Sequence, residues 1–217
     1  MTETIKHHLT DALLMGYSAG ALPEAMNLMV ATHLSLCDTC RAQMESFDIL
    51  GGCLLEDNTD AVAMDAGALD ATLAMLEDGE DVPARQIRAS EGVFPGPLQD
   101  YVGGDLDSVR WKPIGMGVRQ AILPTSGTAS ARLLYIPAGA AVPDHGHQGI
   151  ELTMVLQGAF SDEVDRFARG DVEVADEDLE HTPVADISED CICLAVTDAP
   201  LRFKSWIPRL AQPFLRI

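Results

Sequence analysis

The chain has 217 residues, of which 47% are hydrophobic and 22% charged, a composition typical of ordered globular proteins and not of disordered ones. Its formal charge of −20 argues against direct binding to DNA, RNA or an anionic membrane, because their phosphates repel such a surface. A partner with a basic surface fits better, although acidity also serves solubility alone. The most apolar N-terminal stretch, Leu9 to Leu36, is interrupted by charged residues, glycine and proline, so we expect no signal peptide or membrane span. Five irregularly spaced cysteines indicate reduced thiols and hence a cytoplasmic protein.

The first third of the chain is predicted to be helical. Capping residues and glycines delimit helices over about residues 11–19, 23–36 and 38–50, with a fourth after Asp65. We expect the apolar positions of the first three helices to form a core. The fourth helix carries Leu69, Leu73 and Leu76 at i, i+4 and i+7, and this stripe suits either a core or a partner. The segment from Glu56 to Asp81 adds nine acids and no base, which is either a solvated surface or the border of a partner-binding face.

The character of the chain changes after residue 78. Residues 79–98 contain acids, prolines and glycines without periodicity and are predicted to be a linker. Short apolar runs separated by turn residues then predict an all-β sandwich or barrel, with strands at VRQAIL, ARLLYIP, ELTMVLQG, DVEVAD, CICLAVTD and LRFKSWIP. The prediction is therefore multidomain: an all-α module at 1–78, the linker, and a β-barrel at 99–217.

A first group of metal-binding residue types spans His33, Cys37 and Cys40. His33 and Cys37 are four residues apart near a helix end and share a face, and the Cys-x2-Cys spacing suits two thiolates on one tetrahedral zinc. The fourth ligand would come from His7 or His8, which precede the first helix. A redox Cys-x2-Cys pair normally sits in a βαβ context, which is not visible here. The pattern therefore predicts a structural zinc site.

This arrangement resembles the zinc-binding anti-sigma domain, whose pattern is an N-terminal His followed by His-x3-Cys-x2-Cys. The resemblance covers about residues 5–78 and agrees with four helices. It implies that the zinc ligands are His8, His33, Cys37 and Cys40. It also implies that the fourth helix packs on a sigma factor, which gives Leu69, Leu73 and Leu76 a partner-binding role.

A second group of metal-binding residue types comprises His145, His147 and Glu151, followed thirty residues later by His181. On a strand, residues two apart point to the same side, and Glu151 joins them if the strand continues. Three imidazoles and a carboxylate suit zinc, and equally iron, manganese or nickel. Exposed turn histidines are the alternative, but five of the six histidines fall at ligand positions of only two motifs.

These residues, with Gly139 and Gly158, match the first cupin motif at every fixed position. The second cupin motif keeps Gly170 and His181, whereas Asp176, Asp178 and Ala185 replace its usual Pro, Gly and Asn. The resemblance covers about residues 99–205 and implies a double-stranded β-helix, or jelly-roll, barrel. The three replacements in the second motif affect the expected turn geometry without removing a ligand.

The remaining cysteines are predicted to be structural. Cys191 and Cys193 face the same side of a strand, with Cβ atoms too far apart for an unstrained disulfide, so buried thiols are favoured over a redox pair. Cys53 is expected in a core or at a helix end.

A zinc anti-sigma domain followed by a cupin resembles the ChrR family of anti-sigma factors. The resemblance implies a cytoplasmic, non-enzymatic protein that binds an extracytoplasmic-function-type sigma factor, with 1:1 stoichiometry, and blocks its engagement of core RNA polymerase. It implies release under singlet-oxygen stress, with the cupin part needed for the response, and zinc or another divalent transition metal in the cupin. The alternatives are a cupin metalloenzyme, a dioxygenase or isomerase with a zinc assembly module, and a zinc-dependent scaffold without a sensing role.

Overall fold

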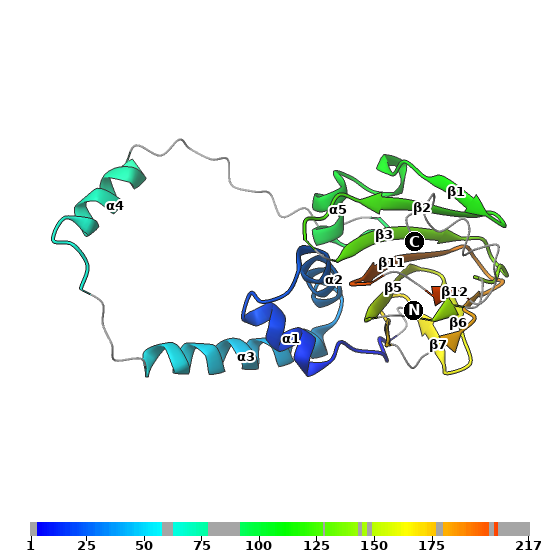
Figure 1. The fold of residues 1–217 in the computed structure, drawn as a ribbon, viewed down its shortest axis with the longest axis horizontal. Helices are drawn as coiled ribbons and strands as arrows, with labels where there is room; N and C mark the ends of the chain where they lie inside the picture. Colours follow the sequence, from blue (N-terminus) through cyan, green and yellow to red (C-terminus); the bar gives the residue numbers. More distant parts are fainter. Residues whose placement is uncertain are drawn as a thin grey trace.

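The structure is a computed structural model that describes residues 4–57, 63–77, 92–127, 129–142, 145–146, 149–176, 180–199 and 202–203. N-terminal helices lie beside an antiparallel β structure (Figure 1). The helices are α1 (Asp11–Ser18), α2 (Glu24–Leu34), α3 (Asp38–Glu56), α4 (Ala68–Glu77) and α5 (Gly96–Val102), with a 3-10 turn at Leu106–Ser108. None of the helices in the described part of the chain is long and apolar enough to cross a lipid bilayer.

The predicted starts of the first three helices are confirmed. The hydroxyl of Thr10 accepts a hydrogen bond from the Leu13 amide and caps α1. Pro23 precedes α2, and the Cys37 sulfur accepts from the Cys40 amide at the start of α3. The predicted end of the third helix is wrong, because α3 continues through its two glycines to Glu56. A glycine inside a helix costs about 1 kcal/mol relative to alanine, which weakens a helix without ending it.

The second half of α3 and all of α4 present apolar side chains to solvent. Along α3, which is described over its whole length, only Cys40 is buried, although Met44 and Phe47 pack partly against the core. The expectation that this helix contributes its apolar positions to a core is therefore wrong beyond Phe47. Figure 1 shows α3 leading away from the sheets and α4 standing apart from the other helices. The exposed apolar residues are Ile49, Leu50, Leu54 and Leu55 of α3 and Leu69, Leu73, Met75 and Leu76 of α4.

The β region consists of one large and two small antiparallel sheets. The six-stranded sheet has the order β1-β2-β3-β11-β5-β8, and the three-stranded sheets have the orders β10-β6-β7 and β12-β4-β9. The strands of the whole β region are β1 (Lys112–Gly115), β2 (Val118–Leu123), β3 (Ser130–Ile136), β4 (His145–Gly146), β5 (Glu151–Gln157), β6 (Ala159–Ser161), β7 (Arg166–Ala168), β8 (Val172–Ala175), β9 (Glu180–His181), β10 (Val184–Ala185), β11 (Cys191–Thr197) and β12 (Arg202–Phe203). The predicted all-β region is confirmed, and five of its six predicted strands match within two residues. The sixth lies largely outside the described residues.

Strand β11 at the centre of the large sheet is buried on both faces. Cys191 and Cys193 point into the barrel interior and join a core with Val155 of β5 and Phe160 of β6. Their sulfur atoms lie 3.5 Å apart as buried thiols, as predicted. The alternate residues of β11 point to the opposite face. A strand covered on both sides explains the continuous apolar run in its sequence.

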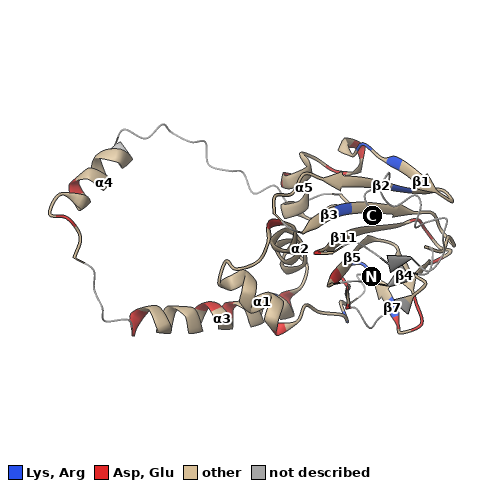
Figure 2. Cartoon of the chain, viewed as in Figure 1, with Lys and Arg blue, Asp and Glu red and all other residues tan. Residues whose placement is uncertain are grey.

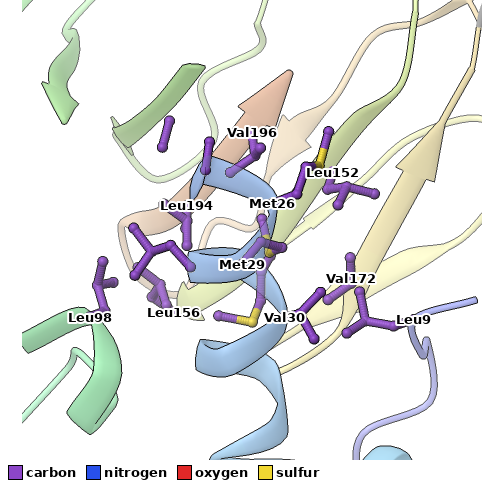
Figure 3. Close-up of a cluster of buried hydrophobic side chains, with 14 of the residues drawn as sticks. Leu9, Met26, Met29, Val30, Leu98, Leu152, Leu156, Val172, Leu194 and Val196 are labelled. Atoms are coloured by element: carbon purple, nitrogen blue, oxygen red, sulfur yellow. The ribbon is translucent and has the colours of Figure 1, made fainter. Parts of the chain in front are cut away.

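Helix α2 covers the outer face of the large sheet. Met26, Met29 and Val30 face apolar residues of β5, β8 and β11 (Figure 3). A fully buried side chain of this size contributes about 1.5–3 kcal/mol, so this contact is a main source of the packing between helices and barrel. Hydrogen bonds add to this apolar contact. The Glu24 carboxylate at the start of α2 accepts from the Tyr101 hydroxyl at 2.8 Å and from the Ser126 amide at 2.6 Å.

The residues just before α5 are also packed. Phe94 and Leu98 are fully buried in the same core as α2, and the Asp105 carboxylate accepts from the Val93 and Phe94 amides. The composition assigns these residues to the linker, yet residues 92–98 pack against both the helices and the sheet. Residues 78–91 lie outside the described residues. The helical and β regions thus share one continuous core.

Candidate metal centres

The first candidate metal centre brings His8, His33, Cys37 and Cys40 together, with one ligand atom of each within 4.8 Å of the others. The Nδ1 atom of His8 lies 3.3 Å from the Cys37 sulfur and 3.6 Å from the Cys40 sulfur. The Nε2 atom of His33 lies 3.3 Å from the Cys40 sulfur. In a tetrahedral zinc site, ordinary Zn–S and Zn–N bond lengths place sulfur and nitrogen ligands about 3.6 Å apart. The observed separations fit such an ion.

Local structure explains why these side chains converge. His33 lies in the last turn of α2, and its carbonyl accepts from the Cys37 amide at 2.9 Å, which turns the chain toward α3. Cys37 caps α3 and Cys40 lies one turn later on the same side. The Nδ1 atom of His33 is 3.0 Å from the Gly170 carbonyl oxygen. Because a carbonyl only accepts, Nδ1 carries the proton and Nε2 keeps its lone pair for a metal.

The electrostatics of this centre suit a cation. Burial, together with the neighbouring His8, lowers the pKa of His33 to about 4, so its imidazole is neutral near pH 7. Burial, assisted by Cys37, raises the pKa of the Cys40 thiol to about 11. A buried thiol of this kind loses its proton readily only when a positive charge compensates the thiolate, and a metal ion supplies that charge.

The neighbouring His7 lies outside this centre. Its Nε2 atom is 3.0 Å from the Asp165 carboxylate, and its ring lies 4.4 Å from that of Phe167. The sequence left His7 and His8 as alternatives for the fourth ligand, and the structure places His8 in the cluster.

A cavity of about 440 Å³ opens beside the first centre, where the helices meet the barrel. His8 and Cys37 line it, together with Thr39 of α3 and Arg169 of the β region. Solvent therefore reaches one side of the centre, whereas His33 and Cys40 are buried.

The second candidate metal centre lies inside the barrel around His181, with Asp162 and Glu173. The Nδ1 atom of His181 is 2.9 Å from Glu173 Oε1 and 3.2 Å from Asp162 Oδ2. Burial works against a charged imidazole here, but hydrogen bonds to Glu173 and Asp162 and the charge of Glu151 raise the pKa of His181. Because Nδ1 donates to these carboxylates, a metal ion at His181 would be bound through Nε2.

Asp162 and Glu173 were not among the residues predicted for this centre. The signal in the sequence was Glu173, a carboxylate at an inward position of DVEVAD, where an unpaired charge is expensive to bury. No comparable signal marks Asp162, which lies in the polar turn after β6.

The four predicted cupin ligands are described by the structure to different extents. His145 of β4 is paired in register with His181 of β9, which confirms that these two backbone positions are neighbours. Glu151 begins β5, is buried, and lies near enough to His181 to affect its pKa. The condition that the strand continue from His145 to Glu151 is not met, because Gly149 and Ile150 are not in a strand and β4 and β5 belong to different sheets. His147 and the side chain of His145 lie outside the described residues.

Three glycines of the cupin motifs have the left-handed backbone that favours glycine: Gly139 at φ 73°, Gly158 at φ 69° and Gly170 at φ 91°. A Cβ atom on Gly158 would also lie 2.7 Å from the Asp190 carbonyl oxygen. The motif glycines are therefore required by backbone geometry, although the second motif lacks its usual Pro, Gly and Asn.

A helical module with a His2Cys2 cluster, packed on a barrel with an internal histidine–carboxylate cluster, defines a two-part protein with one candidate metal centre in each part. Residues 99–201 match the ChrR cupin-like domain family. The anti-sigma-E factor ChrR of Cereibacter sphaeroides is 60% identical over 214 residues, covering 99% of this chain and all of that protein. The crystal structure of Rhodobacter sphaeroides SigE in complex with the anti-sigma ChrR matches with 56% identity and a TM-score of 0.79, covering 89% of this chain and 99% of that one.

The chain belongs to the ChrR family of anti-sigma factors. The predicted family and the predicted combination of a helical module with a cupin are confirmed. Membership in an anti-sigma family also bears out the non-enzymatic prediction over a cupin dioxygenase or isomerase.

Proposed function

We propose that this protein binds and inhibits an extracytoplasmic-function-type sigma factor in a cytoplasmic 1:1 complex, and releases it in response to singlet oxygen. The observation that carries the first part is the 56% identical ChrR chain, which was crystallised with the sigma factor SigE and is matched over 99% of its length. The response to singlet oxygen rests on the family resemblance.

The exposed apolar surface of α3 and α4 is the proposed sigma-binding surface. Leu69 and Leu76 are 67% and 73% exposed, and Leu73 lies between them on the same stripe. A monomeric protein rarely leaves such a stripe uncovered without a partner. Acidic residues are spread along α3 and α4, whereas Lys and Arg gather on β1 to β3 (Figure 2). This distribution favours a partner that is apolar at the centre of its contact and basic around it.

The first centre is proposed to hold a structural zinc ion, with His8, His33, Cys37 and Cys40 as its ligands. The ion would supply charge compensation for the thiolates and a cross-link between the N-terminal segment, α2 and α3. The chain's own part is to orient His33 through the Gly170 carbonyl and to set Cys37 and Cys40 on one side of α3. The position of α3 relative to α2, and so the sigma-binding surface, would depend on this site.

The second centre is proposed to hold zinc or another divalent transition metal through His145, His147, Glu151 and His181. Asp162 and Glu173 would then hold the His181 ring in place and fix its protonation. The proposed division of labour assigns sigma binding to residues 1–78 and the stress response to residues 99–217.

The proposal is tested by coexpressing the tagged full chain with the sigma factor of its native host. We expect a 1:1 complex and repression of a sigma-dependent promoter, relieved by a photosensitiser in light. Leu69→Asp combined with Leu76→Asp should abolish copurification, because a carboxylate cannot be buried unpaired at the contact. Ile187→Asp, at an 89% exposed position in the barrel region, is the matched control and should bind normally. Equal binding by both variants would contradict the proposed surface, and absence of any sigma complex would overturn the function.

A further inference from the structure

One short stretch of chain contacts both candidate metal centres. We call residues 170–173, which include the turn before β8 and its first two residues, the bridging segment. At one end, the Gly170 carbonyl accepts from His33 Nδ1 at 3.0 Å. At the other end, Glu173 accepts from His181 Nδ1 at 2.9 Å. Three residues of chain span at most about 10 Å, so the backbone positions that carry these two groups are no farther apart than that.

Asp171, between these ends, fixes the chain that leads into His8. Its Oδ1 atom accepts from the Lys6 amide at 2.6 Å and the His7 amide at 2.9 Å, and its Oδ2 atom accepts from the Ala168 amide at 2.9 Å. The next amide, of Val172, donates to the His7 carbonyl at 3.2 Å. The Asp171 side chain is buried, so water does not compete for these bonds. The bridging segment therefore positions two histidines of the first centre, His33 directly and His8 through its preceding residue.

The bridging segment cannot shift independently of its surroundings. Gly170 has a left-handed backbone, and a Cβ atom there would lie 2.6 Å from Ile5 Cδ1, so the N-terminal segment packs directly on this residue. On the other side, the Gly170 amide donates to the Val155 carbonyl at 2.8 Å, and the Val155 amide donates to the Asp171 carbonyl at 3.1 Å. Val155 belongs to β5, the strand that begins at Glu151. The backbone that contacts the first centre is therefore hydrogen-bonded to the strand that carries Glu151 of the second centre.

We propose that the bridging segment couples the two centres, so that loss of metal at the second centre weakens metal retention at the first. Asp171 and Glu173 act as positioning residues for His8 and His181, respectively. The proposal rests on the proposed function in that both centres hold metal ions. Removing a partner that orients a metal-bound histidine typically weakens metal binding 10–100-fold. Coupling between two binding sites is reciprocal, so the effect is measurable from either side.

The test uses the full chain loaded with Co²⁺. Cobalt bound by Cys37 and Cys40 absorbs through thiolate-to-metal charge transfer, whereas the second set of proposed ligands contains no thiolate. The rate at which this band disappears after addition of excess chelator therefore reports the first centre alone. When His181→Ala removes a ligand of the second centre, we expect the band to disappear about tenfold faster or more. Circular dichroism checks that the variant is folded.

Variants of the bridging segment test whether the coupling between the two centres depends on its residues. Glu173→Ala leaves every proposed ligand in place and should accelerate cobalt loss as His181→Ala does, whereas Glu173→Gln keeps an oxygen acceptor for Nδ1 and should restore the wild-type rate. Asp171→Ala should accelerate loss about 10–100-fold and abolish any further effect of His181→Ala. Asp105→Ala is the matched control, since this carboxylate also accepts from two consecutive amides, those of Val93 and Phe94, at 2.9 and 3.0 Å. Its rate should stay at the wild-type value.

The possible outcomes distinguish a failure of the coupling from a failure of the proposed metal sites and function. Equal rates in the wild type, His181→Ala and Glu173→Ala, with two metal ions per wild-type chain, overturn the coupling and leave the proposed function intact. Absence of the charge-transfer band from the wild type overturns the coupling together with the proposed first metal site, whereas sigma binding is decided by the copurification experiment. If His181→Ala does not fold, the comparison of Glu173→Ala with Glu173→Gln decides, because equal rates in that pair also exclude coupling.

Discussion

The two halves of the N-terminal helical region have similar apolar stripes but opposite environments. Helix α2 buries Met26, Met29 and Val30 against the large sheet, whereas α4 and the second half of α3 expose leucines to solvent. Both stripes repeat at helical spacing, so periodicity alone does not tell which one faces the protein's own core. The barrel therefore serves as the core for the first half, whereas the apolar side chains of the second half are exposed in the described part of the chain.

The largest expected effect comes from removing the first centre, which ties these halves together. Cys37→Ser should lose the metal ion and weaken sigma binding by at least about 100-fold, because structural zinc typically contributes about 10–16 kcal/mol to folding of small modules. Metal analysis and a binding titration measure the change. Cys53→Ser, at an exposed position of α3, is the control and should retain both properties. Wild-type affinity in a metal-free Cys37→Ser protein would contradict a role for this centre in binding.

A stability comparison separates the buried from the exposed stripe. Met29→Ala should lower the free energy of unfolding by about 2–5 kcal/mol, because it empties a fully buried site between α2 and the sheet. Met75→Ala, at a 75% exposed position of α4, should change it by no more than about 0.5 kcal/mol. Chemical denaturation of the free protein measures both. Similar losses for the two variants would mean that α4 packs on this chain's own core.

Affinity for the sigma factor should depend on the exposed stripe of α4, which contributes little to the stability of the free protein. Leu73→Ala should weaken binding by about 1.5–3 kcal/mol, which corresponds to roughly 10–150-fold, without changing the stability of the free protein. Val164→Ala, another exposed apolar position but in the barrel region, should leave the affinity unchanged. Calorimetric titration with the purified sigma factor gives the values. A Leu73 variant that binds normally but unfolds more easily would assign this leucine to the protein's own core.

The smallest expected effect concerns pH. Burial alone would raise the pKa of Asp171, but amides of Ala168, His7 and Lys6 outweigh it and lower the pKa below its ordinary value. The stabilisation by this carboxylate is therefore complete above the unfolded-state pKa, about 3.9, and is lost as the pH falls through the lower folded-state value. In the metal-free protein, Asp171→Asn should flatten the acid limb of stability below about pH 4 and leave its slope at pH 6–7 unchanged. Parallel acid limbs in the two proteins would contradict the role of these hydrogen bonds.

Much of this organisation was predictable because local chemistry determines it. Capping by Thr10 and the position of Pro23 mark helix starts, and alternating apolar runs mark strands such as Val118–Leu123. The spacing of His33, Cys37 and Cys40 predicted three members of the first cluster, since all lie within eight residues.

The contacts that sequence reasoning missed are long-range. The Gly170 carbonyl reaches His33 from 137 residues away, and Asp162 reaches His181 across 19 residues. The packing of α2 on the sheet was also missed, because an apolar stripe does not identify its partner. Cys53 lies in the last turn of α3, one of its two predicted locations, but it is exposed because that turn extends beyond the core.

The central claim is that sigma binding uses the exposed half of the helical region while α2 stays on the barrel. Hydrogen exchange of the full chain with and without the sigma factor tests this most directly. We predict that amides of Ala68–Glu77 and of the last turns of α3 exchange at least about tenfold more slowly in the complex, whereas those of Glu24–Leu34 stay equally protected. Unchanged exchange in α4, with altered exchange in α2, would contradict the claim and mean that the sigma factor displaces the barrel.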